Sequence, residues 1–591
     1  MRRLCHLSRP AWLDPSELRV GLGCMRLTTE PGRDERLGRE TIAAAIEAGI
    51  TVFDTARAYG HGQTDLGRGE RLLAGALAHT GAASRARVVT KGGMTRPGGG
   101  WVPDGRARAI LADCEASLEA LAGLPIDVYL IHAPDPRTPW RTSVRALARL
   151  LDQHMVGRVG LSNVNRHQLD EALELVPVAA VEVALSVFDD RAWRGGIVER
   201  CEELGIAVIA HSPLGGPRRA ATMARRPPLA AVAGTAGASP AEVALAWLLQ
   251  LSPVVVPIPG ARRPETARSA ARAARLELDP ADRVRLGPGP ARAARAHRTA
   301  VPSSEDGAEV VLFMGIPGAG KTRLAERYLA RGYLRLNRDE RGGGLRELAE
   351  ELEHRLGAGT RRVVLDNTYL TRAARSYVIE AAARHGVPAR CVWLQTPLAQ
   401  AQVNLVDRML ERFGPLPSPE ELRVLGRREP GTLAPTQQMR AIRELEPPST
   451  GEGFSAVEAI EFARTPPAGR TDAGVLVGAA VLDTSGWEVA IGVADPGAAH
   501  LLFDWRPDAS PDALAPLADR LRATVAGTVE SALCPHGAGP PRCWCRPPLP
   551  GLALAFAHRH RLDPARCTLV GTSSAHRTLA ATLGARYVPV S

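Results

Sequence analysis

Residues 50–59 read ITVFDTARAY, a β-branched apolar run that stops at an aspartate and leads into a polar turn. Such a run predicts a buried strand whose carboxyl end carries functional groups. Similar runs recur through the first 300 residues, separated by Ala- and Leu-rich stretches of helical period. The expected strands are 19–23, 50–54, 87–91, 127–132, 157–163, 179–183, 206–212 and 254–260. This alternation predicts a parallel (β/α)8 TIM barrel, with an open doubly wound sheet as the alternative.

Polar residues at the expected strand ends favour the barrel. Asp54, Lys91 and His132 each end a strand, and Asn163 ends the fifth. Tyr59 follows Asp54 by five residues, on the adjoining loop. In a barrel, all of these side chains would project into one mouth at the carboxyl face of the strands.

Lysine is scarce in this chain. Of the 74 basic residues only Lys91 and Lys321 are lysine, and the other 72 are arginine. A chain so biased toward arginine should keep lysine where a compact or titratable ammonium is required. Both lysines fall inside motifs, so we expect both to be functional.

The segment FDTARAY (53–59), together with Lys91 and His132, resembles the aldo-keto reductase family over about residues 17–286. The resemblance implies reduction of a carbonyl by a nicotinamide cofactor, with Tyr59 as the proton donor. A nearby cation lowers the pKa of a phenol, and Lys91 would do so here. Asp54 would orient the ammonium, and His132 would hydrogen-bond the carbonyl oxygen.

The same resemblance implies a nicotinamide site. Ser162 and Asn163, in GLSN (160–163), match positions that bind the carboxamide. Glu182 stands where the family usually has glutamine, and His211 stands where an aromatic ring usually stacks on the nicotinamide. The site therefore departs from the family pattern at two positions.

A second segment bears on the choice of cofactor. IPGARRPE (258–265) resembles the turn that grips the adenosine 2'-phosphate, with Arg262 and Glu265 as the implied contacts. NADPH is therefore favoured over NADH. The carbonyl substrate is a small molecule that the sequence does not name, and Trp140 is the one candidate for a wall of its pocket in residues 133–142.

Residues 287–308 are expected to be a linker, because they are rich in Pro, Gly, Ala and Arg without apolar period. A new domain, residues 309–450, opens with VVLFM (310–314) and GIPGAGKT (315–322). A strand, a G-x-x-x-x-G-K-[ST] loop and a helix form a phosphate loop that binds ATP with Mg²⁺. Its candidate residues are Gly315, Gly318, Gly320, Lys321 and Thr322.

Three later segments, YLRLNRDE (333–340), RRVVLDNTYLT (361–371) and residues 388–409, resemble the kinase domain of polynucleotide kinases. The resemblance implies Asp339 as the general base, Asp366 as a residue that positions the acceptor or the metal, and Arg408 as part of a lid. A 5'-hydroxyl end of a short nucleic acid, a nucleoside and a small hydroxyl substrate all remain candidate acceptors.

Residues 451–591 form the third expected domain. From about residue 470, three segments (475–486, 534–551 and 567–590) resemble haloacid dehalogenase (HAD) superfamily phosphatases with a Rossmann-like α/β fold. The first strand should end in Asp-x-Asp, but Gly478 and Ala480 stand there. We therefore expect this domain to be inactive as a phosphatase.

The third domain also contains a metal motif. Cys534, His536, Cys543 and Cys545 fit a tetrahedral Cys₃His zinc site, with C-x-H and C-x-C pairs on one loop. Zinc would staple a Pro/Gly-rich loop that has little core of its own.

Composition is consistent with a multidomain α/β protein. The chain has 591 residues, of which 45% are hydrophobic and 23% charged. No apolar run is long enough to cross a bilayer and no secretory signal is evident, so we expect a cytoplasmic protein without a membrane partner. The sequence predicts an NADPH-dependent reductase fused to an ATP-dependent kinase. The alternative is a nucleotide-sensing or nucleic-acid-end-binding scaffold with one or both enzyme domains inactive.

Overall fold

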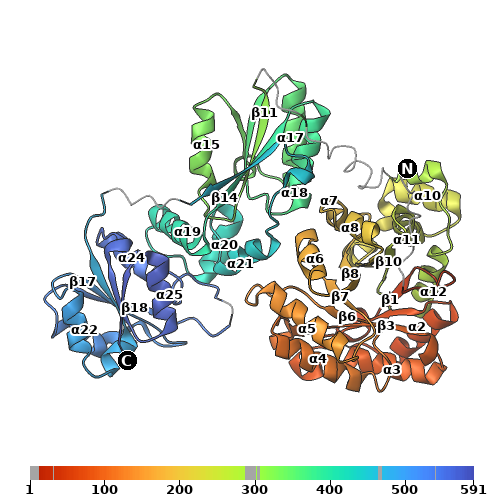
Figure 1. The fold of residues 1–591 in the computed structure, drawn as a ribbon, viewed down its shortest axis with the longest axis horizontal. Coiled ribbons are helices and arrows are strands. Elements are labelled where there is room, and N and C mark those ends of the chain that lie inside the picture. The colour runs from red at the N-terminus through yellow and green to blue at the C-terminus, as the bar shows by residue number, and fades with distance from the viewer. Residues whose placement is uncertain are drawn as a thin grey trace. The chain divides into compact units, whose positions relative to one another are not determined.

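The computed structural model describes residues 12–590 except 31, 287–300, 302–306, 463–468 and 540. The described chain forms two compact units, one containing residues 1–299 and 371–380 and one containing 300–370 and 381–591 (Figure 1). Most of the expected linker, 287–308, lies outside the described residues. Each unit is taken separately below.

The first unit is built on eight parallel strands in chain order. They are β1 (Gly21–Gly23), β2 (Val52–Asp54), β3 (Arg87–Gly92), β6 (Val128–Ile131), β7 (Val159–Ser162), β8 (Val178–Ala184), β9 (Ala207–His211) and β10 (Val255–Pro257). The amide of Gly23, at the end of β1, donates to the carbonyl of Pro259, just past β10, at 3.1 Å. The sheet therefore curves round until its edges meet, as the barrel prediction requires.

Helices and one small hairpin surround these strands (Figure 1). The helices are α1 (Met25–Thr28), α2 (Glu35–Glu47), α3 (Arg68–Thr80), α4 (Ala107–Ala120), α5 (Trp140–Asp152), α6 (Arg166–Leu173), α7 (Arg191–Arg194), α8 (Ile197–Leu204), α9 (Pro217–Ala220), α10 (Pro227–Ala236), α11 (Pro240–Leu251), α12 (Pro264–Ala273) and α13 (Pro280–Arg285). Strands β4 (Met94–Thr95) and β5 (Val102–Pro103) pair antiparallel in the loop after β3.

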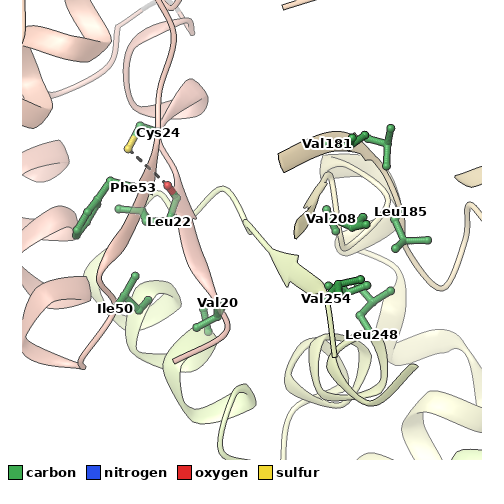
Figure 2. Packing of buried hydrophobic residues seen from close by; sticks show 14 of the residues in the cluster. Val20, Leu22, Cys24, Ile50, Phe53, Val181, Leu185, Val208, Leu248 and Val254 are labelled. Carbon is green, nitrogen blue, oxygen red and sulfur yellow. Dashed lines mark hydrogen bonds between the residues drawn. The ribbon is translucent and has the colours of Figure 1, made fainter. Parts of the chain in front are cut away.

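Successive residues of each barrel strand pack alternately into two different apolar layers. Val52, Val89 and Ile209 belong to a cluster contributed largely by the strands themselves. Phe53 and Val208, each one residue away from a member of that cluster, belong to the larger core shared with the helices, part of which Figure 2 shows. The period-two pattern buries both faces of each strand, which explains why the strands are apolar up to their functional carboxyl ends.

The second unit begins with a five-stranded parallel sheet in the order β12-β13-β11-β14-β15. Its strands are β11 (Glu309–Met314), β12 (Leu334–Leu336), β13 (Arg362–Asp366), β14 (Ala389–Gln395) and β15 (Ala456–Glu461). Its helices are α15 (Lys321–Leu329), α16 (Arg338–Arg341), α17 (Leu345–Gly357), α18 (Arg372–Arg384), α19 (Leu398–Phe413), α20 (Pro419–Arg428) and α21 (Pro435–Glu444).

The expected domain boundary at residue 450 needs correction. Strand β15 pairs in parallel with β14 from Ala456 to Glu461, so the phosphate-loop sheet extends past that point. The strand was missed because most of its side chains are exposed at the sheet edge, leaving no apolar run to read.

A second parallel sheet completes this unit, in the order β18-β17-β16-β19-β20. Its strands are β16 (Gly474–Gly478), β17 (Ala499–Trp505), β18 (Val529–Cys534), β19 (Thr568–Gly571) and β20 (Arg586–Pro589), with helices α22 (Trp487–Ala494), α23 (Ala515–Arg522), α24 (Gly551–Arg559) and α25 (Ser574–Leu583). The order reverses beside β16, the first strand, which is the switch point where open α/β sheets place their sites.

No single helix among the described residues is long and apolar enough to cross a membrane. Helices α10 and α11 meet that test only when taken together, and they are bent by 92° relative to each other.

Candidate functional site

Four buried polar side chains meet at the mouth of the barrel. The ammonium Nζ of Lys91 lies 2.5 Å from Asp54 Oδ1, 3.2 Å from the Tyr59 hydroxyl and 3.1 Å from Glu182 Oε2. These groups come from β2, β3, β8 and the loop after β2. Lys91 is fully buried, and the side chains of Asp54 and Glu182 are 2% and 4% exposed. The structure thus brings together the expected Asp54, Tyr59 and Lys91 and adds Glu182.

The electrostatics of this cluster are dominated by burial. Burial, and next the charge of Glu182, raises the pKa of Asp54 to about 8, although Lys91 opposes the shift. Burial alone would lower the pKa of Lys91, but Asp54 and Glu182 bring it well above its usual value. Lys91 lowers the pKa of Tyr59 as expected, yet burial outweighs it and the net shift is upward. The phenol is therefore protonated at neutral pH and available as an acid.

His132 lies beside the phenol, with its ring centroid 5.9 Å from that of Tyr59. Burial and the charge of Lys91 hold the pKa of His132 well below its usual value, so the imidazole is neutral. Its Nδ1 has no hydrogen-bond partner among the described residues. A neutral ring next to the phenol can donate one N–H to a carbonyl oxygen.

Trp101, which the sequence did not single out, lies next to Tyr59 and His132. Its ring centroid is 6.2 Å from that of Tyr59 and 5.8 Å from that of His132, and the Arg96 guanidinium lies over it at 3.7 Å. Trp101 is 43% exposed. A large aromatic ring left half open beside the acid is suited to hold a substrate.

The sequence pointed instead to Trp140 as a wall of the substrate pocket, which is wrong. Trp140 begins α5, packs against the barrel core and donates its indole N–H to the Gln168 carbonyl at 2.9 Å. Trp101 lies in the loop between β4 and β5, a polar, glycine-rich stretch whose fold carries no sequence signal of its own.

The expected nicotinamide contacts form a linked set. The Asn163 amide donates to Ser162 Oγ and to the His132 carbonyl, both at 3.1 Å, and its Oδ1 lies 3.2 Å from His211 Nε2. Asn163 itself has φ 58°, a strained left-handed conformation. A carboxamide could exchange hydrogen bonds with the asparagine while the flat imidazole of His211 packs on the ring, so these residues fit a nicotinamide.

Arg262 and Glu265, the expected 2'-phosphate contacts, lie at the turn into α12. Arg262 pairs with Glu30 at 3.4 Å and keeps 38% of its side chain exposed. Glu265 is an exposed residue in the first turn of α12. A half-exposed guanidinium near a helix N-terminus is a chemically suitable contact for a phosphate.

The phosphate loop joins β11 to α15, as the motif predicts. Gly318 and Gly320 have φ values of 87° and 92°, and the amide of Gly315 bonds to the Thr368 carbonyl. The Lys321 ammonium donates to the carbonyls of Gly315 and Ile316 at 2.9 and 3.0 Å. Thr322, on the first turn of α15, is exposed and can reach a metal ion. The loop has the geometry of a phosphate cradle.

The other expected kinase residues gather round Lys321. Burial lowers its pKa to about 8. Asp366 and Asp339 raise the pKa and Arg408 lowers it, so these three charges lie within electrostatic range of the ammonium. Asp339 is 44% exposed on α16, and Arg408 donates to the Gly431 carbonyl at 2.9 Å.

Asp366, which the sequence predicts to position the acceptor or the metal, is held by two neighbouring side chains. Its carboxylate is 2% exposed and pairs with the Arg335 guanidinium at 2.5 Å, and Asn337 also donates to it at 3.3 Å. These two donors fix the carboxylate in place at the end of β13.

At the switch point of the last sheet, the imidazole of His576 packs against the carboxyl ends of β16 and β19. A Cβ added to Gly478 would lie 2.3 Å from a ring carbon of His576, and a Cβ added to Gly571 would also meet His576. The ring is 5.4 Å from that of Phe503. The Gly478 end of β16 is thus packed against a histidine and has no acidic pair.

Cys534, His536, Cys543 and Cys545 converge on one point after β18. One ligand atom from each lies within 4.8 Å of all the others. The Cys534 sulfur lies 3.7 Å from that of Cys543 and 3.4 Å from that of Cys545. A tetrahedron with Zn–S bonds of about 2.3 Å has edges of about 3.8 Å, so these separations fit a zinc ion and exclude disulfides.

Comparison with known proteins supports the barrel and the phosphate-loop domain. The family model described as aldo/keto reductase matches residues 19–286, and a model described as AAA domain matches residues 310–423. An uncharacterized oxidoreductase of Schizosaccharomyces pombe is 30% identical over 268 residues, 44% of this chain and 82% of that protein. A probable aldo-keto reductase of Glycine max is 30% identical over 275 residues, 41% of this chain and 76% of that protein.

Among solved structures, a glycerol dehydrogenase of Gluconobacter oxydans matches at 26% identity and TM-score 0.41, covering 47% of this chain and 93% of that one. The eight-stranded barrel, the buried cluster at its mouth and the two 30%-identical relatives agree. Through residues 19–286, this chain belongs to the aldo/keto reductase family, and a phosphate-loop α/β domain follows the barrel along the sequence.

Proposed function

We propose that the barrel reduces a small carbonyl compound with NADPH, using Tyr59 as the proton donor. The observation that carries the proposal is the Lys91 ammonium, 3.2 Å from the Tyr59 hydroxyl, both of them in buried side chains. When an alkoxide develops on the substrate, the phenol can give it a proton. The adjacent ammonium then stabilises the phenolate that is left.

The neighbouring residues orient the substrate. The neutral His132 donates a hydrogen bond to the carbonyl oxygen, and the exposed face of Trp101 supports the rest of the molecule. Ser162, Asn163 and His211 would hold the reduced nicotinamide, which would supply the hydride. Arg262 and Glu265 would favour NADPH over NADH by contacting the 2'-phosphate.

Cofactor fluorescence tests this proposal. NADPH titrated into the full chain should show saturable quenching, and a carbonyl panel should reveal turnover. Tyr59→Phe should bind NADPH within about threefold of the wild type while turnover falls by at least about a hundredfold, the scale of one general-acid group. Unchanged turnover in Tyr59→Phe would contradict the assignment.

We further propose that the phosphate-loop domain is an ATP-dependent kinase that acts on a hydroxyl group. The three charges that act on Lys321 favour this over simple nucleotide binding, because phosphoryl transfer needs cations on the phosphates and a carboxylate for the acceptor proton. Asp339, the more exposed of the two acids, would take that proton. Thr322 would hold Mg²⁺, Gly315, Gly318 and Gly320 would cradle the phosphates, and the fixed carboxylate of Asp366 would position the acceptor or the metal.

Labelled ATP with 5'-hydroxyl RNA, 5'-hydroxyl DNA, nucleosides and sugars would identify the acceptor, a polynucleotide 5' end being one candidate. Asp339→Asn should lower transfer at least about a hundredfold with ATP affinity retained. Lys321→Ala should weaken ATP binding itself. Equal transfer by Asp339→Asn and the wild type would exclude Asp339 as the base.

We propose that the last sheet is a HAD-like domain without phosphatase activity that holds a structural zinc ion. The glycine at the end of β16 and the donor set Cys534, His536, Cys543 and Cys545 support both parts. Metal analysis of the purified chain should give close to one zinc per chain, and Cys545→Ser should lower that ratio. Less than half an equivalent in the wild type would count against the zinc site.

A further inference from the structure

The Lys91 ammonium faces two carboxylates, whereas a single one would neutralise it. Asp54 Oδ1 and Glu182 Oε2 lie 2.5 and 3.1 Å from Nζ. Asp54 is on β2, the strand next to β3, whereas Glu182 is on β8 and reaches Lys91 across the barrel interior. All three side chains are at most 4% exposed. With both acids ionised and Tyr59 neutral, the cluster would hold one negative charge in excess, with no solvent to screen it.

The surrounding groups do not compensate this excess. Burial raises the pKa of the Cys24 thiol, which therefore stays neutral. Burial lowers the pKa of His132 and that of His211, the latter to about 4, so neither imidazole brings a positive charge. The Arg96 guanidinium donates to backbone carbonyls, those of residues 58, 60 and 99, rather than to either acid.

Protonation of one carboxylate is the remaining way to balance the excess negative charge. An uncompensated buried charge costs far more free energy than protonation of a carboxylate. Two carboxylates that share one site ionise one at a time. The glutamine that the family usually has at position 182 carries no ionisable group and could not share this proton with Asp54. Glu182 therefore does more than contact the cofactor.

We propose that Asp54 and Glu182 share one proton and that this pair, acting through Lys91, is an internal proton store for Tyr59. After Tyr59 gives its O–H proton to the substrate oxygen, Lys91 gives an N–H proton to the tyrosinate. The shared carboxyl proton then moves to the Lys91 nitrogen, and both carboxylates are ionised until water returns a proton. The hydrogen bonds of Lys91 Nζ to the Tyr59 hydroxyl at 3.2 Å and to Asp54 Oδ1 at 2.5 Å carry these transfers, while Glu182 Oε2 lies 3.1 Å from Nζ as an ion pair without hydrogen-bond geometry.

Glu182 is thus a positioning residue that holds a proton without touching the substrate. The inference deepens the proposed reductase function and rests on it for the last proton-transfer step. The shared proton itself exists in the resting protein and can be measured with no carbonyl substrate.

Infrared spectroscopy of the full chain at neutral pH tests the shared proton. The wild type minus Glu182→Gln difference spectrum should contain the C=O stretch of one protonated carboxyl group, and so should wild type minus Asp54→Asn. Glu70→Gln is the matched control, because Glu70 is a buried carboxyl bonded to Thr90 rather than to Lys91. The Glu70→Gln variant should lose only the absorption of Glu70 itself and should keep the band of the protonated Asp54–Glu182 pair. Absence of that band from both test spectra overturns the proposal.

The pH profile of reduction tests the role of the store. In the wild type the rate should fall above about pH 8, where the pair loses its proton. Glu182→Gln removes the like charge that Asp54 faces, so the falling limb should move or vanish, whereas Glu70→Gln should keep the wild-type profile. An infrared band with an unmoved limb overturns the proton-store role. If no carbonyl is reduced at all, the reductase proposal fails while the infrared result still decides the shared proton.

Discussion

The two lysines show how far single residues can be interpreted. Lysine scarcity indicates that Lys91 and Lys321 are functional, and the structure places Lys91 in a buried polar cluster and Lys321 in a partly buried phosphate loop. The contact between Lys91 and its second carboxylate could not be predicted from the sequence, because Glu182 lies on β8 and meets β3 only through the barrel interior. Side chains that meet across a barrel are set by tilt and closure, which no local pattern encodes.

The pH dependence of stability follows from Asp54. Because burial raises its pKa from 3.8 to about 8, the folded barrel keeps a proton that the unfolded chain has already lost in that range. The free energy of unfolding of the barrel should therefore fall as pH rises from about 4 to about 8. Asp54→Asn should flatten this fall in calorimetry of the full chain. Asp34→Asn, at the exposed N-cap of α2, is the control and should keep the wild-type slope.

Trp101 should govern substrate binding more than chemistry. Trp101→Ala removes the ring beside Tyr59 and His132, so KM for the carbonyl should rise by about tenfold, which corresponds to about 1.4 kcal/mol, with kcat little changed. Trp140→Phe is the matched control. It loses the hydrogen bond to the Gln168 carbonyl and part of the ring that packs on the core, and should cost about 1 kcal/mol or more of stability with KM unchanged. A KM effect confined to Trp140→Phe would reverse the assignment.

At the scale of elements, the strand-loop-helix context of the phosphate loop was predictable because it depends on contiguous residues. The edge strand β15 was not, since its exposed alternating side chains resemble a loop. The loop glycines also differ in a way that only the fold reveals. A Cβ on Gly318 would lie 2.3 Å from the Ala401 carbonyl of α19, whereas one on Gly320 would meet nothing within 4 Å.

This difference predicts unequal effects of two alanine substitutions. Gly318→Ala combines an unfavourable φ of 87° with a backbone clash, so the second unit should lose about 3 kcal/mol or more. Gly320→Ala has a φ of 92° and no clash, and should cost about 1 kcal/mol. Thermal unfolding of both variants shows which one loses more stability. Equal losses of stability would show that the contact with α19 is unimportant.

At the scale of the whole molecule, the second unit has a core that joins its two sheets. Val403, Met409 and Leu410 of α19 belong to one buried cluster with Leu476 and Trp544. The indole N–H of Trp544, between two of the predicted zinc ligands, donates to the Leu433 carbonyl at 2.8 Å. The phosphate-loop domain and the last sheet should therefore unfold together.

A charge placed in this cluster tests that cooperativity. Met409→Asp buries an unpaired carboxylate and should lower the stability of the second unit by about 3 kcal/mol or more. Both the nucleotide domain and the last sheet should melt earlier, while NADPH binding by the barrel stays unchanged. Glu411→Ala, at an exposed position of the same helix, should have little effect. Early melting of the last sheet alone would show that the two sheets are independent.

The sequence by itself determined the strands of the barrel, the phosphate loop and the grouping of the metal ligands, because each depends on residue types at short, regular spacing. Only the tertiary structure decided that Glu182 faces Lys91, that Trp101 rather than Trp140 flanks Tyr59, and that His576 fills the space beside Gly478. Those contacts join segments far apart in the chain, and their energy depends on burial and closure that exist only once the fold has formed.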